Sequence, residues 1–165
     1  MALSKITTAS VADTAVHGRR NHIINGAMQV AQRGTSFDET SSAFTLDRFR
    51  LPNTVAYTTD PQFTVTQGNG YPDEGFLKSW KVTVDVAGSG GTNLDISIMS
   101  YKTEAQDLAP LDWGGNNPKQ SVLSFYVKSS VVGKYGMFMY NPTSGNEFIT
   151  SYTVDTANTW ERKEI

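Results

Sequence analysis

Apolar and polar residues alternate strictly over residues 80–86, WKVTVDV. In a β-strand successive side chains point to opposite faces, so the tryptophan and the three valines would share one face. The same period of two recurs, or apolar residues favour a strand, in several other stretches: residues 21–31, 44–49, 63–65, 94–98, 123–127, 148–154 and 159–165. Strands with one buried and one wet face are typical of antiparallel sheets, so the sequence predicts an all-β fold.

Turn-forming residues separate the alternating runs. Clusters of Gly, Asn and Pro occur at residues 68–70, 88–91, 114–118 and 141–142. This spacing is typical of an antiparallel sandwich, whereas a parallel α/β fold would need crossover helices. The best helical stretch, residues 104–108, is followed closely by Pro110, so we expect at most one or two turns of helix there.

Composition narrows the classes of function. The 165 residues favour one main domain, and a net charge of −2 gives no general attraction to nucleic acid or to anionic membranes. The chain has no cysteine, which removes disulfides and Cys-ligated zinc and fits folding in a reducing cytoplasm. No apolar run reaches the length of about 20 residues that a membrane-spanning helix needs, and no signal-peptide pattern follows Met1.

Residues 1–20 differ from the rest of the chain. They are rich in Ser, Thr and Ala and carry irregularly spaced apolar residues: Leu3, Ile6, Val11 and Val16. These side chains bury too little alone to offset the entropy of ordering, but they could lie against another protein as a short helix or an extended arm. A frayed terminus is the alternative interpretation. We therefore expect an attachment arm over residues 1–20 and a β-sandwich over residues 21–165.

Five stretches, in order, carry a resemblance. They are RNHIINGAMQVAQRGT (residues 20–35), FTLDRF (44–49), SYKTEAQDL (100–108), SVLSFYVKS (121–129) and TVDTANTWERK (153–163). They resemble motifs of bacteriophage tail-fibre and virion structural proteins, such as RNLIINGAMQVAQRGTS and VTLSFWVKSS. Phe49 departs from this pattern, because tryptophan is commoner there.

The resemblance implies a jelly-roll β-sandwich similar to carbohydrate-binding modules. It also implies a virion protein of the tail or fibre that is made in the host cytoplasm, contacts other virion proteins and forms a homotrimer. Members of the family usually continue with further strands, so we expect the sandwich to be incomplete near Ile165. Two alternatives stay open: a glycan-binding module that recognises the host surface, and a head decoration or head-fibre protein.

Catalytic and metal-binding patterns are weak. The carboxylates are spread singly, and both histidines, His17 and His22, lie near the N-terminus, so we expect neither an enzyme nor a cofactor. Asp47 and Arg48 are predicted to form a buried or half-buried ion pair that pins the strand, in preference to a role in catalysis or ligand binding. Asp73 and Glu74 are candidate calcium ligands, although without an Asp-x-Asp-x-Asp loop a solvated acidic turn is favoured.

Aromatic side chains offer the one candidate ligand surface. Trp80 alternates with valines and Trp160 falls in a strand motif, so we expect both to pack in the core. Trp113, in a loop, and Tyr71 are the candidates for contact with a glycan or another subunit.

Overall fold

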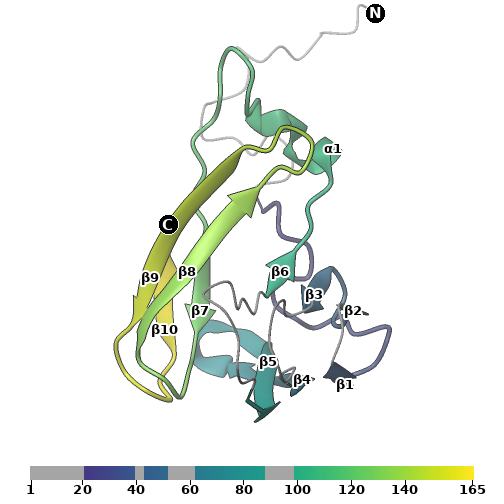
Figure 1. Ribbon diagram of the computed structural model, residues 1–165, viewed down its shortest axis with the longest axis vertical. Coiled ribbons are helices and arrows are strands. Elements are labelled where there is room, and N and C mark those ends of the chain that lie inside the picture. The colour runs from purple at the N-terminus through teal and green to yellow at the C-terminus, as the bar shows by residue number, and fades with distance from the viewer. Residues whose placement is uncertain (1–20, 40–42, 52–61, 88–98) are drawn as a thin grey trace, which may run out of the picture. The chain divides into compact units, whose positions relative to one another are not determined.

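The computed structural model describes residues 21–39, 43–51, 62–87 and 99–165 (Figure 1). The predicted arm with Leu3, Ile6, Val11 and Val16 lies outside these residues, as do the strand at 94–98 and the turn at 88–91. None of the helices in the described part of the chain is long and apolar enough to cross a membrane.

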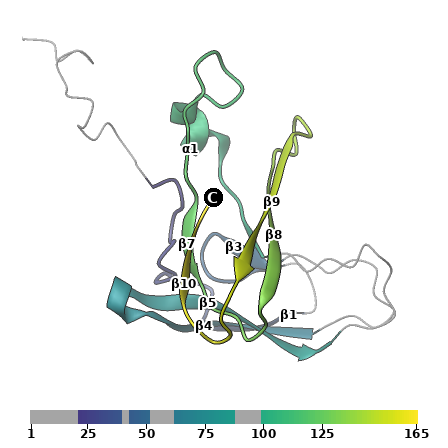
Figure 2. The same ribbon diagram turned by 90° about the vertical axis from the view of Figure 1, so that its left-hand side faces the viewer.

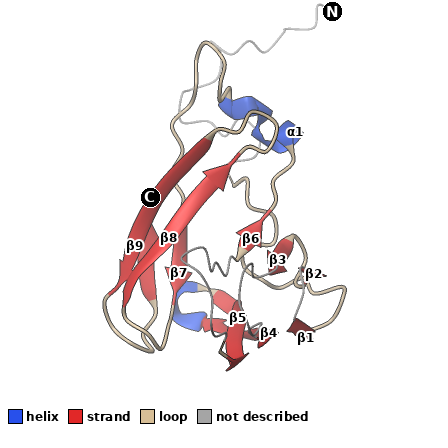
Figure 3. Cartoon of the chain, viewed as in Figure 1, coloured by secondary structure: helices blue, strands red, loops and turns tan. Residues whose placement is uncertain are grey.

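Strands dominate the described residues (Figure 3). They are β1 (Ser36–Glu39), β2 (Ala43–Phe44), β3 (Phe49–Leu51), β4 (Gln62–Tyr71), β5 (Phe76–Val86), β6 (Ser100–Tyr101), β7 (Ser124–Val127), β8 (Gly133–Tyr140), β9 (Glu147–Val154) and β10 (Glu161–Glu164). The helical segments have three or four residues each: η2 (Pro72–Glu74), α1 (Ala105–Leu108) and η3 (Ala109–Leu111). The strand pairings are antiparallel. The prediction of an all-β fold is confirmed.

The chain divides into two compact units. Unit 1 consists of Met1–Gly68 and Trp80–Pro110, and unit 2 of Asn69–Ser79 and Leu111–Ile165. The chain therefore passes from one unit into the other within β4, and again within β5.

Unit 1 contains the sheets β1-β4-β5 and β2-β3-β6. Its core is a cluster of Leu51, Phe63 and Val65, against which Trp80 and Val82 pack. The Trp80 ring lies 5.4 Å from the ring of Phe49, and its Nε1 donates over 3.0 Å to the hydroxyl of the fully buried Thr45. The predicted core position of Trp80 is confirmed.

The buried face of β5 is shorter than its alternation predicts. Val84 is 59% exposed and Val86 is also exposed, because Trp80 and Val82 are the apolar residues of β5 that pack against the core cluster. The expectation of one buried face along all of residues 80–86 is therefore wrong for the last valines.

Unit 2 contains the sheets β7-β10 and β8-β9, whose paired strands lie side by side in Figure 2. Backbone hydrogen bonds of 2.9 Å in both directions between Leu123 and Ile165 extend the β7-β10 pair. Tyr152 on β9 packs its ring 5.0 Å from Phe125 and 5.6 Å from Tyr135, next to the buried Val154. The strand predicted at residues 159–165 is confirmed as β10.

The strand expected over residues 21–31 is wrong. This segment forms turns, and Asn25 and Met28 adopt the left-handed backbone conformation, with φ of 59° and 56°. A strand cannot continue through such residues, and the apolar side chains between them do not overcome this.

The turn expected at residues 68–70 is also wrong, since these residues belong to β4. The chain reverses instead through η2 and Gly75, which has a φ of 80°. Gly70 is buried against the backbone of Phe76 and Lys78, where a Cβ would collide with both. This glycine therefore allows a close approach of two strands and does not mark a turn.

Other local predictions hold. Turns are present at residues 114–118 and 141–142, where Gly115 donates to Asp112 and Gly145 to Asn141. The helix at 104–108 is a single turn, α1, and passes into η3, which contains Pro110.

Candidate functional site

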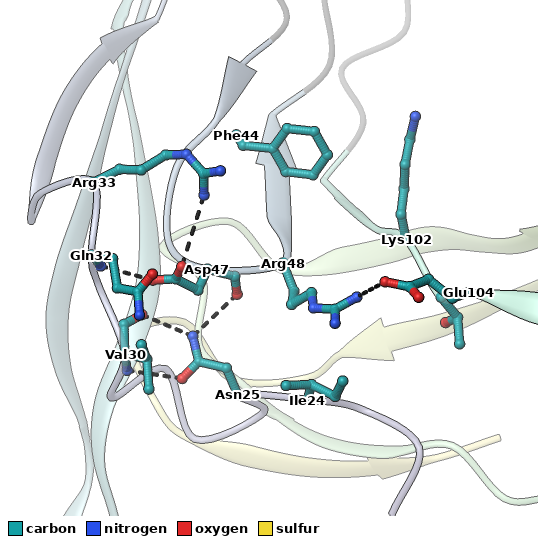
Figure 4. A pocket seen from close by; sticks show the side chains of 11 residues that line it. Ile24, Asn25, Val30, Gln32, Arg33, Phe44, Asp47, Arg48, Lys102 and Glu104 are labelled. Atoms are coloured by element: carbon teal, nitrogen blue, oxygen red, sulfur yellow. Dashed lines mark hydrogen bonds and ion pairs between the residues drawn. The ribbon is translucent and has the colours of Figure 1, made fainter. Parts of the chain in front are cut away.

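Unit 1 carries an open pocket of about 670 Å³ (Figure 4). Its lining comes from three stretches: residues 24–33, 44–48 and 102–104. Small-molecule sites in proteins are commonly clefts of roughly 300–1,000 Å³. The size of this pocket is therefore sufficient for a small ligand.

Asn25 holds one wall of the pocket through its side-chain amide. Its Oδ1 accepts the backbone N–H of Val30 over 2.9 Å, and its Nδ2 donates to the carbonyls of Val30 (2.9 Å) and Asp47 (3.1 Å). The amide thus replaces the hydrogen bonds that a neighbouring strand would give Val30. Asparagine also tolerates the left-handed backbone better than most residues do.

Asp47 ties the same wall to the turn between β2 and β3. Its Oδ2 accepts the backbone N–H of Gln32 over 2.8 Å, and its Oδ1 lies 3.8 Å from Nη1 of Arg33. The predicted ion pair of Asp47 with Arg48 is wrong. Arg48 has a φ of 74°, and its guanidinium pairs with Glu104 instead.

The ion pair between Arg48 and Glu104 closes the opposite side of the pocket. Nη1 of Arg48 donates to Glu104 Oε1 over 2.7 Å, and Glu104 Oε2 accepts from Nε2 of Gln106 over 2.8 Å. The hydrogen bond to Glu104 raises the pKa of the Arg48 guanidinium above its ordinary value, so this group stays charged.

Phe44 supplies the apolar part of the pocket and is 41% exposed. The guanidinium carbon of Arg33 lies 5.8 Å from the centre of its ring, and that of Arg50, beside the pocket, lies 5.9 Å away. In Figure 4, Arg33 and Lys102 extend on either side of the ring. Cations held over the face of an aromatic ring are attracted by its quadrupole, which keeps positive charge next to Phe44.

The lining offers contacts for binding. It contains no histidine, cysteine or serine. Within the described residues, no group of three or more His, Cys, Asp or Glu is placed to hold a metal ion. His22 uses its Nδ1 in a 2.8 Å hydrogen bond with the carbonyl of Asp107.

The candidate calcium ligands Asp73 and Glu74 and the candidate contact residues Tyr71 and Trp113 lie elsewhere, in unit 2. Asp73 and Glu74 are exposed in η2. Burial is the larger cause that raises the pKa of Tyr126, and a hydrogen bond to Glu74 raises it further. Asp73 and Glu74 thus lie in an exposed acidic turn, in which Glu74 contacts Tyr126.

Tyr71 and Trp113 differ in accessibility. The Tyr71 ring stacks on Trp160 at 6.2 Å and meets Tyr126 edge-on at 5.4 Å, so Tyr71 is a packing residue. Trp113 is 47% exposed, and its Nε1 donates to the carbonyl of Lys119 over 3.0 Å. The ring of Trp113 remains accessible, and no described ring contact joins it to Tyr71.

Glu161 is a structural carboxylate that the sequence analysis missed. Its Oε1 accepts the backbone N–H groups of Thr156 (2.7 Å) and Asp155 (3.0 Å), and its Oε2 lies 2.6 Å from Nζ of Lys163. These hydrogen bonds lower the pKa of Glu161 to about 2. The bond from Lys163 has the largest effect, followed by those from Thr156 and Asp155. Opposite charges two residues apart on one strand share a face, and this spacing was the available signal.

Protein-family models, curated proteins and solved structures were each compared with this chain, and none matches it.

Proposed function

We propose that this chain is a non-enzymatic structural protein of a bacteriophage virion, the particle-attaching part of a tail fibre. In this proposal residues 21–165 form a jelly-roll β-sandwich and residues 1–20 bind another virion protein. The observation that carries it is that the stretches resembling virion-protein motifs bind one another within the fold.

Three of these stretches meet in unit 1. Asn25 and Gln32, from residues 20–35, hydrogen-bond to Asp47, and Arg48 in the same turn pairs with Glu104. The backbone N–H of Ile24 also donates to the hydroxyl of Tyr101 over 2.8 Å. The polar side chains of these motifs thus hold loops and strand ends together, as expected of a scaffold.

The other two stretches pair with each other in unit 2. Residues 121–129 contain β7 and residues 153–163 lead into β10, and Phe125 on β7 lies opposite Lys163 on β10. Antiparallel pairing of strands that are distant in sequence, here and between β3 and β6, is expected in a jelly roll.

The proposal includes the homotrimer that the resemblance implies, and the β8-β9 pair offers a surface for contact between its subunits. The half of the β8-β9 pair next to its connecting turn exposes Phe138 and Tyr140 on β8 and Phe148 and Ile149 on β9. In the described residues neither strand pairs with a third. Apolar strands with open edges bind other strands, so we assign this half of the β8-β9 pair to contact between copies of the chain.

Deletion of residues 1–20 tests the attachment role. The shortened chain is expected to keep the β-sheet circular dichroism spectrum of the full chain but to be missing from purified particles. Trp113→Ala in the full chain is the control and should be incorporated normally. Normal incorporation of the deletion variant would disprove the arm, and a reconstruction of the particle distinguishes tail from head.

Glycan binding through Trp113 is a second candidate, favoured by the exposure of its ring. The expected support is saturable binding on a glycan array that Trp113→Ala removes. A blank array, or binding that survives this substitution, would count against it.

A further inference from the structure

The pocket of unit 1 is lined by three cationic side chains and two carboxylates. Both carboxylates accept hydrogen bonds from the protein, Asp47 from Gln32, and Glu104 from Arg48 and Gln106. A ligand entering the pocket therefore meets carboxylates that are already occupied.

Two of the three cations that line the pocket, Arg33 and Lys102, remain available. Arg33 lies 3.8 Å from Asp47, beyond hydrogen-bond distance, and its side chain is 56% exposed. Lys102 is exposed and has no ion pair within the described residues. Guanidinium and ammonium groups are donors only, so the missing partner is an acceptor, and the strongest acceptor for them is an anion.

The charges of the residues around the pocket also favour an anion. Three cations, Arg33, Arg48 and Lys102, line the pocket with two carboxylates, and Arg50 adds a further cation beside Phe44. The chain as a whole has a net charge of −2. The pocket is therefore a positive site in an acidic protein and attracts negative ligands.

The half-exposed Phe44 ring selects among anions. It places a rigid apolar surface next to Arg33, and Lys102 extends on its other side (Figure 4). A pyranose with a carboxylate carries an apolar C–H face and an anion on one small rigid ring, so it meets both features at once. A glutamate-rich peptide offers carboxylates on flexible stems without such a face.

We infer that this pocket binds a carboxylate-bearing sugar unit, with Lys102 and Arg33 contacting the carboxylate and Phe44 contacting the sugar ring. This assignment adds a ligand site to the structural role and differs from the Trp113 surface in unit 2.

Titration of the full chain with methyl glucuronide, followed by amide NMR, tests the assignment. Methyl glucoside, which lacks the carboxylate, is the matched neutral probe. We expect saturable shifts that include the amides of Gln32 and Lys102 with the glucuronide, and none with the glucoside. Lys102→Gln and Arg33→Gln should each weaken binding about tenfold, the loss of one charge-assisted hydrogen bond. Lys134→Gln, on the exposed side of β8, should leave it unchanged.

Several results would overturn the inference. These are no binding of the glucuronide, equal binding of the glucoside, unchanged affinity in both pocket variants, or tighter binding of a hexaglutamate peptide. Because particle incorporation is a separate measurement, failure here leaves the structural proposal standing, and the reverse also holds.

Discussion

Arg48 and Glu104 are 56 residues apart in sequence, and their side chains meet at 2.7 Å. The contact joins the turn between β2 and β3 to the residue that precedes α1. It closes one side of the pocket in unit 1.

Charge reversal tests this relationship. Arg48→Glu should lower the melting temperature of the full chain, because it sets two carboxylates against each other. The pair is partly exposed, so the shift should be small. Adding Glu104→Arg should restore most of the loss in thermal denaturation followed by circular dichroism. If the double variant is no more stable than the single one, the two side chains do not interact in solution.

Asn25→Ala should destabilise the chain by about 1–3 kcal/mol, because the side chain makes three hydrogen bonds and the backbone is left-handed. Urea denaturation measures this free energy of unfolding. Asn21→Ala removes only one exposed contact, to the N–H of Ile23, and should cost clearly less. Equal losses in the two variants would contradict the bracing role of Asn25.

Gly70→Ala should be severe, costing about 3 kcal/mol or more, because the added methyl group collides with the backbone of Phe76 and Lys78. Gly75→Ala is the matched control in the same hairpin. Nothing lies within 4 Å of its added Cβ, so only the left-handed strain of about 1–2 kcal/mol applies. Chemical denaturation should reproduce this order, and the opposite order would show that the strands do not approach closely at Gly70.

Glu161 predicts a pH dependence of stability. Folding lowers the pKa of its carboxyl from 4.5 to about 2, so its stabilisation is complete above pH 4.5 and is lost as the pH falls through 2. The stability difference between the natural chain and Glu161→Gln should therefore shrink as the pH falls from 4.5 to 2. Glu147→Gln, at an exposed position on β9, is the control. A difference that stays constant over this range would rule out the low pKa.

Ile149→Lys should weaken self-association without unfolding the chain, because Ile149 is 67% exposed at the apolar end of β9. Light scattering coupled to size exclusion should show a shift from oligomer to monomer. Thr153→Lys, exposed on β9 but outside the apolar half, is the control and should leave the mass unchanged. A monomeric natural chain would contradict the assigned contact surface.

The sequence predicts strands well where local pattern and tertiary packing agree. Trp80 and Val82 alternate with polar neighbours and do pack on the core of unit 1. Alternation fails over residues 21–31, because it does not reveal the left-handed backbone of Asn25 and Met28.

Contacts between distant residues are harder to predict. Nothing local to Arg48 indicates that it turns away from its neighbour Asp47 toward Glu104. The pocket is similarly invisible in the sequence, since its walls come from three separated stretches. In contrast, the pairing of Glu161 with Lys163 follows from strand spacing and could have been predicted.

Unit 2 takes Asn69–Ser79 from between the two parts of unit 1. Neither unit is therefore encoded by one continuous segment of the gene. A single crossover between related genes cannot exchange one whole unit for another. We expect these two strands to be inherited together.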